Sequence, residues 1–426
     1  MSPRIENVSD VAEWQLCSGC GVCAYMDPGA IEMVDDLHYG RRPQPKGALS
    51  SAVGLDACPG IRLERRTDQY PKGTVEDLEN DWGPVLTVWE GYAKDDVVRR
   101  GSSSGGAATA LGLYGLERGG MYGVLHTVAD TDDPIRNTTQ LSRDRDHLLG
   151  GMGSRYSPAS PCEGLQLIED SPAPCMFIGK PCDVAAASAA GNLIPALDKQ
   201  LGMKVSIFCA GTPSTHGTNE LLKIMGITES SDLASFTYRG NGWPGDAEVR
   251  ELGSPTKIKE RMSYAQSWGI LQRYRQWRCY VCVDHTGEFS DISVGDPWYR
   301  TIEEGEAGRS LIVARSERGR KFVQAASDAG FLSVREVSPS RLPDSQPGLA
   351  KTQAAIWGRL AACRSMGLPV PSHVGFPLFR NWLLRLTINQ QAQSILGTLK
   401  RVIVKRLYRR VGRPGERASS TEEPIE

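Results

Sequence analysis

Along the middle of the chain, short apolar runs alternate with segments that have a helical pattern of apolar and polar positions. Four short apolar runs predict β-strands, and the segments between them predict helices. The strands are expected over residues 85–92, 121–128, 175–178 and 204–208, and the helices over residues 107–116, 184–190 and 217–225. Strands that alternate with helices are typical of a mainly parallel sheet with helices packed on it. The sequence therefore predicts an α/β core, with an N-terminal part over 81–165 and a C-terminal part over 166–342.

The N-terminal residues have a different pattern from the core. Residues 1–80 show little helical periodicity and contain many loop-forming Pro and Gly residues. This favours a small module that is held together by a cofactor rather than by a hydrophobic core of its own. The charged stretch over 62–84 is expected to be a linker between this module and the core.

The composition changes again after residue 343. Between Phe376 and Gly415 there are nine Lys or Arg residues and no Asp or Glu. Leu399, Ile403, Leu407 and Val411 fall on one face of a predicted helix. Residues 343–426 are therefore expected to form a basic helical extension with a polar, disordered end. Its helix is either simply solvated or a contact surface for a membrane or a protein.

Bulk composition narrows the class of protein. The chain has 426 residues and a formal net charge of −1, so nothing global indicates binding to nucleic acid. Its first residues lack the basic start and apolar stretch of a signal peptide, and no apolar run approaches the ~18 residues that span a bilayer. We therefore expect a cytoplasmic protein, peripheral to the inner membrane at most. In that compartment, eleven cysteines indicate metal or redox chemistry rather than disulfides.

A first cysteine set lies in the N-terminal module. Cys17, Cys20 and Cys23 form a C-x2-C-x2-C motif, and Cys58 follows at a distance, directly before a proline. Such a triplet can bind three corners of a [4Fe–4S] cluster while the distant Cys-Pro supplies the fourth ligand. A structural zinc site is the alternative, but zinc usually has two separated C-x2-C pairs. The spacing thus favours an iron–sulfur cluster.

A Gly/Ser loop leads directly into the helix predicted over 107–116. The loop consists of Arg100, Gly101, Ser102, Ser103, Ser104, Gly105 and Gly106. Backbone N–H groups at a helix start, together with hydroxyls and a nearby arginine, can hold a phosphate. The loop matches neither the dinucleotide fingerprint nor the P-loop, and a flexible turn with a serine cap is the alternative. The paired arginines before the loop favour a flavin phosphate site.

A second cysteine set is spread over the core. Cys182 and Cys209 each follow a predicted strand, and Cys279 and Cys282 form a C-x2-C pair. Ligands of open α/β sheets bind beyond the carboxyl ends of the strands, so these thiols could complete a second four-thiolate site. Alternatively, the two strand-end cysteines are small buried hydrophobes beside a lone pair. The remaining cysteines are expected to be structural: Cys162, Cys175 and Cys363.

Three polar residues of the core are further candidates. His216 follows Cys209 on the same side of the predicted sheet and could protonate a substrate, although a helix-capping surface histidine is the simpler interpretation. Arg239 could contact a phosphate or an anionic substrate. Asp296 could hold flavin hydroxyls or only cap a turn.

Several segments together resemble the coenzyme F(420) hydrogenase/dehydrogenase beta-subunit family, which includes 7-hydroxymethyl chlorophyll a reductase and divinyl chlorophyllide reductase relatives. The similar segments are Gly101–Gly106, Phe177–Cys182, Phe208–Gly211, Arg239–Pro244 and Cys279–Trp298, within a similarity over residues 10–330. The resemblance implies a ferredoxin-like module on an α/β flavin-binding core, with FAD (or FMN) and one or two [4Fe–4S] clusters. It also implies that both cysteine sets are cluster ligands and that 102–106 and Tyr156 lie near the flavin.

These implied cofactors predict an iron–sulfur flavoprotein oxidoreductase. Clusters carry single electrons and a flavin accepts one or two, so the chain would pass electrons to or from a deazaflavin or another small organic acceptor. Ferredoxin or another redox protein is the expected electron partner. The alternative is an electron-transfer subunit of a larger redox complex, without a substrate of its own.

Overall fold

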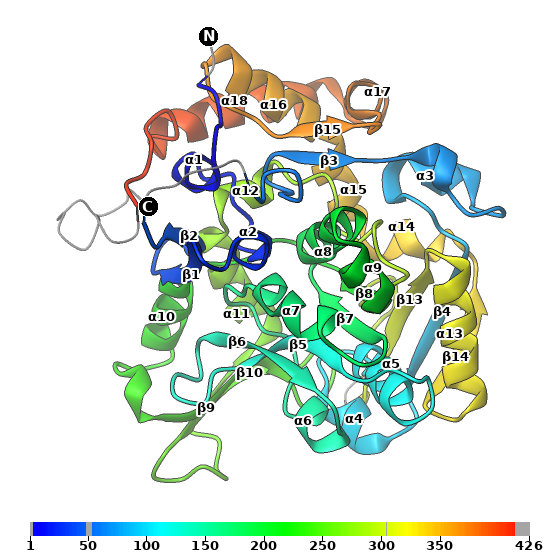
Figure 1. Cartoon of the computed structure of the whole chain (residues 1–426). Helices are drawn as coiled ribbons and strands as arrows, with labels where there is room; N and C mark the ends of the chain where they lie inside the picture. Colours follow the sequence, from blue (N-terminus) through cyan, green and yellow to red (C-terminus); the bar gives the residue numbers. More distant parts are fainter. Residues whose placement is uncertain (1–2, 48–52, 304, 414–426) are drawn as a thin grey trace.

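The computed structural model describes residues 3–47, 53–303 and 305–413 (Figure 1). Within these residues, an eight-stranded sheet has the order β14-β4-β13-β12-β8-β7-β5-β6. Its strands are β4 (Thr87–Ala93), β5 (Val124–Ala129), β6 (Asn137–Ser142), β7 (Cys175–Gly179), β8 (Leu201–Ile207), β12 (Ile292–Gly295), β13 (Ser310–Ala314) and β14 (Leu332–Val337).

The sheet is parallel at its centre and antiparallel at its flanks. β12, β8, β7 and β5 pair in parallel, whereas β13, β4 and β14 on one side and β6 on the other pair antiparallel with their neighbours. The α/β prediction is thus confirmed, with a mixed sheet around a parallel centre. The fully buried β7 has apolar residues on both faces, which is why a short apolar run marks it in the sequence.

Helices cover both faces of the sheet. Met176 and Ile178 of β7 face a core shared with α5 (Ala107–Glu117) and α13 (Glu317–Asp328), whereas Cys175 and Phe177 face α8 (Pro181–Leu193). This alternation follows from the two-residue period of a strand. The other helices around the sheet are α4 (Asp96–Gly101), α6 (Arg145–Leu149), η2 (Pro161–Gly164), α7 (Leu165–Glu169) and α9 (Pro195–Gln200).

A second, antiparallel sheet packs beside the main one. It has the order β11-β10-β9, and residues 249–264, which have an irregular sequence pattern, contribute to two of its strands. Its strands are β9 (Leu233–Gly240), β10 (Asp246–Glu251) and β11 (Glu260–Ser263), and the nearby helices are α10 (Thr215–Ile224), η3 (Ser230–Asp232), α11 (Tyr264–Leu271), η4 (Gln272–Tyr274) and α12 (Trp277–Tyr280).

The N-terminal module has a small hydrophobic cluster of its own, which includes Val8, Cys23 and Met33, so the prediction of a module without its own core is wrong. It contains α1 (Val8–Glu13), α2 (Val22–Met26), β1 (Ile31–Asp36) and β2 (Gly40–Pro45). Val11 and Cys17 pack with Trp277 of the core and Val402 of the C-terminal extension. Residues 62–84 are not a plain linker, because they include β3 (Arg62–Glu64), η1 (Thr67–Gln69) and α3 (Glu76–Trp82), whose Trp82 is buried.

The C-terminal extension is helical, as predicted, and lies along one edge of the molecule beside α1 (Figure 1). It comprises α14 (Arg341–Ser345), α15 (Pro347–Ala354), α16 (Ile356–Ser365), β15 (Ser372–Val374), α17 (Leu378–Arg385) and α18 (Ile388–Val404). The predicted face over Leu399–Val411 is wrong, because Leu407 is buried while Ile403 is exposed. α18 ends at Val404 and the chain turns, which breaks the periodicity. Among the described residues, no helix has the length and apolarity that a bilayer crossing requires.

Candidate functional site

A cavity of about 290 Å³ opens where β7, β8 and β12 end; we call it the strand-end cavity. The carboxyl ends of parallel strands are where open α/β sheets bind their ligands. Many of the residues that the sequence predicts to bind a cofactor line it together. These are Ser102, Ser103, Ser104, Gly106, Tyr156, Arg239, Asp296 and the second-set residue Cys209.

The Gly/Ser loop forms one wall of the cavity just before α5. A Cβ on Gly105 would lie 2.6 Å from Ser310 N and 2.7 Å from Gly91 O, so only glycine fits against β4 and β13 there. Ser104 Oγ donates to Arg309 O at 2.6 Å, whereas the buried Ser102 Oγ has no hydrogen-bond partner among the described residues. Ser102 is the C-cap of α4, and a buried hydroxyl without a partner in the loop that leads to α5 fits a bound anionic or polar group.

The start of the predicted loop lies outside the cavity. Arg100 is exposed, and neither it nor Gly101 lines the cavity; Gly105 contributes its backbone N–H to Ser310 Oγ at 3.0 Å. The neighbouring Arg99 donates to Gly308 O at 3.0 Å and stacks on Tyr92. Neither arginine of the pair that favoured a phosphate site lines the cavity: Arg99 packs on Tyr92, and Arg100 is exposed.

Arg239 and Asp296 line the cavity as a bidentate pair. Arg239 Nη1 and Nη2 donate to the two carboxylate oxygens at 2.8 and 2.7 Å, and Trp243 Nε1 donates to the same carboxylate at 2.9 Å. Although burial opposes its charge, Asp296 raises the pKa of the Arg239 guanidinium. The guanidinium also stacks on Tyr264. This charged aromatic wall is rigid, because each of its polar groups is satisfied internally.

An aromatic cluster continues this wall beyond the predicted residues. Tyr156 packs against Trp268 with ring centroids 5.1 Å apart, and Tyr264 stacks on Trp298. Tyr264 and Trp268 line the cavity as well, although no motif marks them in the sequence. Flat aromatic walls suit a planar ligand such as a flavin ring.

The first cysteine set gathers at the N-terminal module. Burial raises the pKa of Cys23, and the neighbouring Cys17, Cys20 and Cys58 thiols raise it further, so all four lie within electrostatic reach of one another. Gly19 and Gly21 adopt φ values of 76° and 88°, which lets the chain turn tightly between the thiols. The Gly19 N–H donates to Cys17 Sγ at 3.3 Å.

Two buried arginines lie beside the first cysteine set. Burial raises the pKa of the Cys17 thiol, while Arg42 and then Arg278 lower it. Both guanidiniums are almost fully buried, and the Nε atom of each has no hydrogen-bond partner among the described residues. Buried cations with unsatisfied donors need a nearby anion. Four thiolates on a cluster would provide that charge, so the donor set fits an iron–sulfur cluster.

The second cysteine set also comes together from distant parts of the chain. Burial raises the pKa of Cys209 to about 12, and the adjacent Cys279 contributes in the same direction. Cys182 lies within electrostatic reach of Cys209 and Cys282. The Thr212 N–H donates to Cys279 Sγ at 3.3 Å. The two strand-end cysteines are therefore not isolated buried thiols.

Lys180 and Arg278 connect the three regions. Lys180 lines the strand-end cavity, and although burial opposes its charge, Asp183 and Cys182 raise the pKa of its ammonium. Burial raises the pKa of Cys58 and Cys282, and Arg278 works against it at both, so this cation lies between the two sets. Arg278 thus adjoins both cysteine sets, and Cys209 of the second set lines the cavity. In the sequence, Lys180 lies just before Pro181-Cys182, and Arg278 lies just before Cys279. A basic residue beside a cysteine motif is therefore the signal that could have identified both cations.

The three cysteines outside both sets have structural contacts. Cys162 hydrogen-bonds with Cys20 and donates to Asp183 O at 3.3 Å, whereas Cys175 and Cys363 are buried in hydrophobic clusters. In residues 3–47, 53–303 and 305–413, no group of three or more His, Cys, Asp or Glu side chains is arranged to hold a metal ion.

His216 lies away from the cavity. Its backbone N–H donates to Leu37 O at 2.8 Å, and its ring packs against His38 and Tyr274 with centroids 4.6 and 5.3 Å away. It is the second residue of α10, after the N-cap Ser214. This position fits the helix-start interpretation better than contact with a substrate in the cavity.

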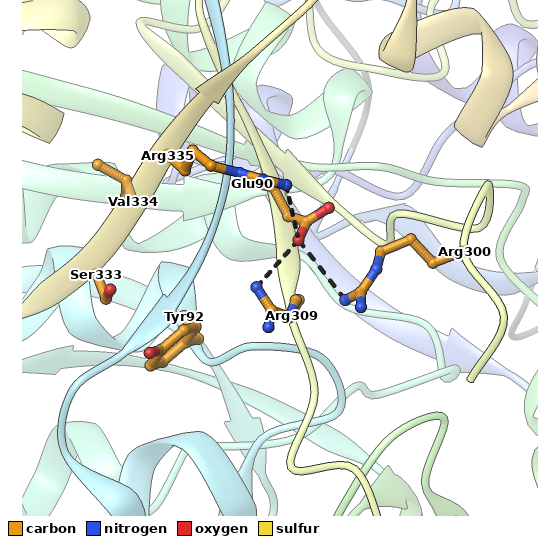
Figure 2. A pocket seen from close by; sticks show the side chains of 7 residues that line it. All are labelled: Glu90, Tyr92, Arg300, Arg309, Ser333, Val334 and Arg335. Carbon is orange, nitrogen blue, oxygen red and sulfur yellow. Dashed lines mark hydrogen bonds and ion pairs between the residues drawn. The ribbon is translucent and has the colours of Figure 1, made fainter. Parts of the chain in front are cut away.

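A second hollow, of about 450 Å³, contains a separate charge cluster (Figure 2). Arg300, Arg309 and Arg335 converge there on the buried Glu90, with the closest contact, from Arg309, at 3.1 Å. None of the predicted site residues lines this hollow. The arginines tie the loop before β13 and the edge strand β14 to β4.

Comparison with known proteins finds similar sequences and a similar fold. Two models of the coenzyme F(420) hydrogenase/dehydrogenase beta subunit match: the N-terminal one over residues 88–166, and the C-terminal one over residues 174–340. An uncharacterised protein of Methanocaldococcus jannaschii is 23% identical over 366 residues, covering 77% of this chain and 91% of that protein. The beta subunit of coenzyme F(420) hydrogenase from Methanosarcina barkeri is 22% identical over 280 residues, covering 60% and 85%.

A solved structure shares the fold. A chain of the F(420)-reducing [NiFe] hydrogenase complex from Methanosarcina barkeri superposes with a TM-score of 0.52 at 20% sequence identity. The match covers 67% of this chain and 96% of that one. The family models lie entirely within the core, and neither reaches the first cysteine set or α16–α18.

Proposed function

This chain belongs to the coenzyme F(420) hydrogenase/dehydrogenase beta-subunit family, and from that premise we propose that it is an iron–sulfur flavoprotein oxidoreductase. It would pass electrons through [4Fe–4S] clusters and a flavin, FAD or FMN, to or from a deazaflavin or another small organic acceptor. Membership in a family of redox-enzyme subunits supports the reaction class. The cofactors and the acceptor are parts of the proposal.

One observation carries the proposal: the two cysteine sets adjoin the same buried arginine, and the second set adjoins the cavity. Cys209 belongs to the second cysteine set and also lines the strand-end cavity. Arg278 interacts with Cys17 and Cys58 of the first set and with Cys282 of the second. Clusters bound at the two cysteine sets would allow single electrons to move between the N-terminal module and the cavity. A structural zinc site would not require two neighbouring cysteine sets beside a ligand cavity.

Each part of the site has a role in the proposal. A bound flavin supplies two-electron chemistry and exchanges single electrons with clusters. Ser102 and the start of α5 would hold its polar part, and the Arg239–Asp296 wall with its aromatic neighbours would orient its ring. Lys180 would place positive charge where negative charge develops, since it faces both the cavity and the second set. Arg42 and Arg278 would balance the charge of the first cluster.

Two comparisons are also compatible with a narrower role. The similar coenzyme F(420) hydrogenase protein is a beta subunit, and the similar solved chain is part of a hydrogenase complex. The chain could therefore act as an electron-transfer subunit that depends on a protein partner. We favour an enzyme with its own acceptor site, because the strand-end cavity has an unsatisfied hydroxyl and an aromatic wall ready for ligands.

Turnover by the isolated chain distinguishes the two roles. The protein is purified without oxygen, reduced with dithionite, freed of excess reductant and mixed with a deazaflavin or a flavin analogue. Rapid reoxidation in step with acceptor reduction, followed by absorbance, is expected for an enzyme. Reoxidation only after addition of a redox protein such as ferredoxin would favour the subunit role, and a colourless preparation would sink both.

A further inference from the structure

An aliphatic surface covers the outer side of α17 and α18. Phe379, Leu383, Leu384, Ile388, Leu396 and Ile403 are all at least half exposed, from 50% for Leu383 to 82% for Ile388. These helices lie along the outer edge of the molecule (Figure 1). Single exposed apolar residues are common, but five aliphatic residues and one aromatic residue in one helical pair are not.

α18 exposes a line of aliphatic side chains on its outer side. Ile388, Leu396 and Ile403 are spaced by eight and seven residues and share one helical stripe with Ala392 and Leu399; we call it the aliphatic stripe. The buried face carries Ser394, Thr398 and Val402, and Ser394 Oγ accepts a hydrogen bond from Trp382 Nε1 at 3.0 Å. Besides its buried face, α18 therefore has a second, exposed apolar face that is available for contact on the outer side.

The charge around the stripe is positive. Residues 376–413 contain nine Lys or Arg residues and no Asp or Glu. Arg385 pairs with Asp81, and Arg410 pairs with Asp10 and Glu13. Arg413 also pairs with Glu13, and the other six cations form no ion pair with any residue in the described ranges: Arg380, Lys400, Arg401, Lys405, Arg406 and Arg409. The occupant of this surface must therefore be apolar and anionic together.

We propose that α17 and α18 dock on an anionic membrane surface. Aliphatic side chains would enter the boundary between headgroups and acyl chains, while the long Lys and Arg side chains reach the lipid phosphates. A second copy of the chain fits less well, because a two-fold interface would bring like charges of the two α18 helices together. The surface thus combines both signals that peripheral binding requires.

Docking in this way would position the N-terminal module. Beyond α18 the chain returns to α1, where Val411 N donates to Glu13 O at 2.9 Å. Val402 and Leu407 share a hydrophobic cluster with Cys17. The first cysteine set would therefore lie close to the membrane, and the strand-end cavity would lie farther away. The docking itself does not depend on the proposed redox function.

Vesicle flotation with the full chain tests the proposal. We expect the protein to float with vesicles of phosphatidylcholine and phosphatidylglycerol in equal parts, and much less with phosphatidylcholine alone. High salt should weaken the binding. A variant with Leu384→Glu, Ile388→Glu and Leu396→Glu should bind at least about tenfold more weakly. It loses three aliphatic side chains that enter the membrane, and the added carboxylates reduce the positive charge of the surface.

Matched substitutions control for surface charge alone. Ile224 and Leu252 are 59% and 64% exposed and lie far from α18 in the sequence, so Ile224→Glu with Leu252→Glu should leave binding unchanged. Equal loss in this variant would overturn the proposal. So would binding of the wild-type chain to neither kind of vesicle. Sizing of the unliganded protein shows whether the stripe instead joins two copies: a dimer that the triple variant dissociates, without vesicle binding, also overturns it.

Discussion

At the scale of single residues, the site is defined by buried groups that lack partners. Ser102 Oγ, Arg42 Nε and Arg278 Nε are buried without hydrogen bonds among the described residues, and each lies beside a region that the sequence assigns to a cofactor. The cysteine motifs themselves could be predicted, because ligand spacing is a local property of the chain. The arginines could not, because their proximity to the thiols depends on how β2 and α12 pack.

The thiol Cys209 links the second cysteine set to the cavity, so its replacement has a specific outcome. Cys209→Ser should reduce the iron content from about eight to about four atoms per chain, because one cubane loses a ligand. Iron analysis after anaerobic purification checks this. Cys363→Ser removes a buried thiol outside both sets and should leave the iron content unchanged. Equal iron in both variants would show that Cys209 is not a ligand.

His126 lines the cavity and makes the fold sensitive to acid. Burial lowers the pKa of this imidazole from 6.5 to about 4. The unfolded chain therefore binds a proton at this residue before the folded chain does, and the free energy of unfolding falls as the pH drops from 6.5 to 4. The loss from this group is up to about 3 kcal/mol. Urea unfolding of His126→Gln across this range should show a shallower loss.

Two other buried histidines set the background for that measurement. Burial also lowers the pKa of His285, to about 4, and of His373, to about 3. Part of the acid sensitivity should therefore persist in His126→Gln. An unchanged slope between pH 6.5 and 4 would mean that His126 is already protonated in the folded protein or is not buried.

At the scale of elements, the core follows from local patterns and the flanks do not. β7, β8 and α5 were predictable, because buried strands are short apolar runs and α5 follows a Gly/Ser loop. β13 and β14 lie late in the chain and join the sheet next to β4, a long-range pairing that no local pattern encodes. The aliphatic stripe of α18 was missed for a related reason, since periodicity does not tell which face of a helix is buried.

The close approach of the Gly/Ser loop to β13 gives a prediction for this element. Gly105→Ala places a methyl group 2.6 Å from Ser310 N, so the loop must shift. We expect a loss of about 1–3 kcal/mol in unfolding free energy and weaker retention of flavin during purification. Gly348→Ala is the control, because a Cβ there meets nothing within 4 Å. Full flavin retention in Gly105→Ala would count against this loop as the binding wall.

At the scale of the whole molecule, the three sequence regions behave as one packed body. The family resemblance indicated the core, and the cysteine spacing indicated a module, but neither indicated that the C-terminal helices complete the hydrophobic cluster around Cys17. β3 of the N-terminal part pairs with β15 of the extension. Such contacts depend on side chains that are hundreds of residues apart, so composition alone could not reveal them.

A buried ion pair tests this interdependence. Arg65, just after β3, donates to Glu288 of the core at 2.5 Å, and both side chains are almost fully buried. Glu288→Ala leaves the guanidinium buried without its counterion, so we expect a loss of about 3–5 kcal/mol in unfolding free energy. The solvent-screened pair of Arg62 and Glu64 is the control, and Glu64→Ala should leave the unfolding free energy almost unchanged. Similar losses would mean that β3 is not anchored to the core.

Counting cofactors tests the arrangement of thiols and cavity most directly. Protein prepared without oxygen is analysed for iron, acid-labile sulfide and flavin per chain. Two cubanes and one isoalloxazine ring predict about eight iron atoms, about eight sulfides and one flavin. Zinc in place of iron, or a preparation with no yellow or brown chromophore, would contradict it.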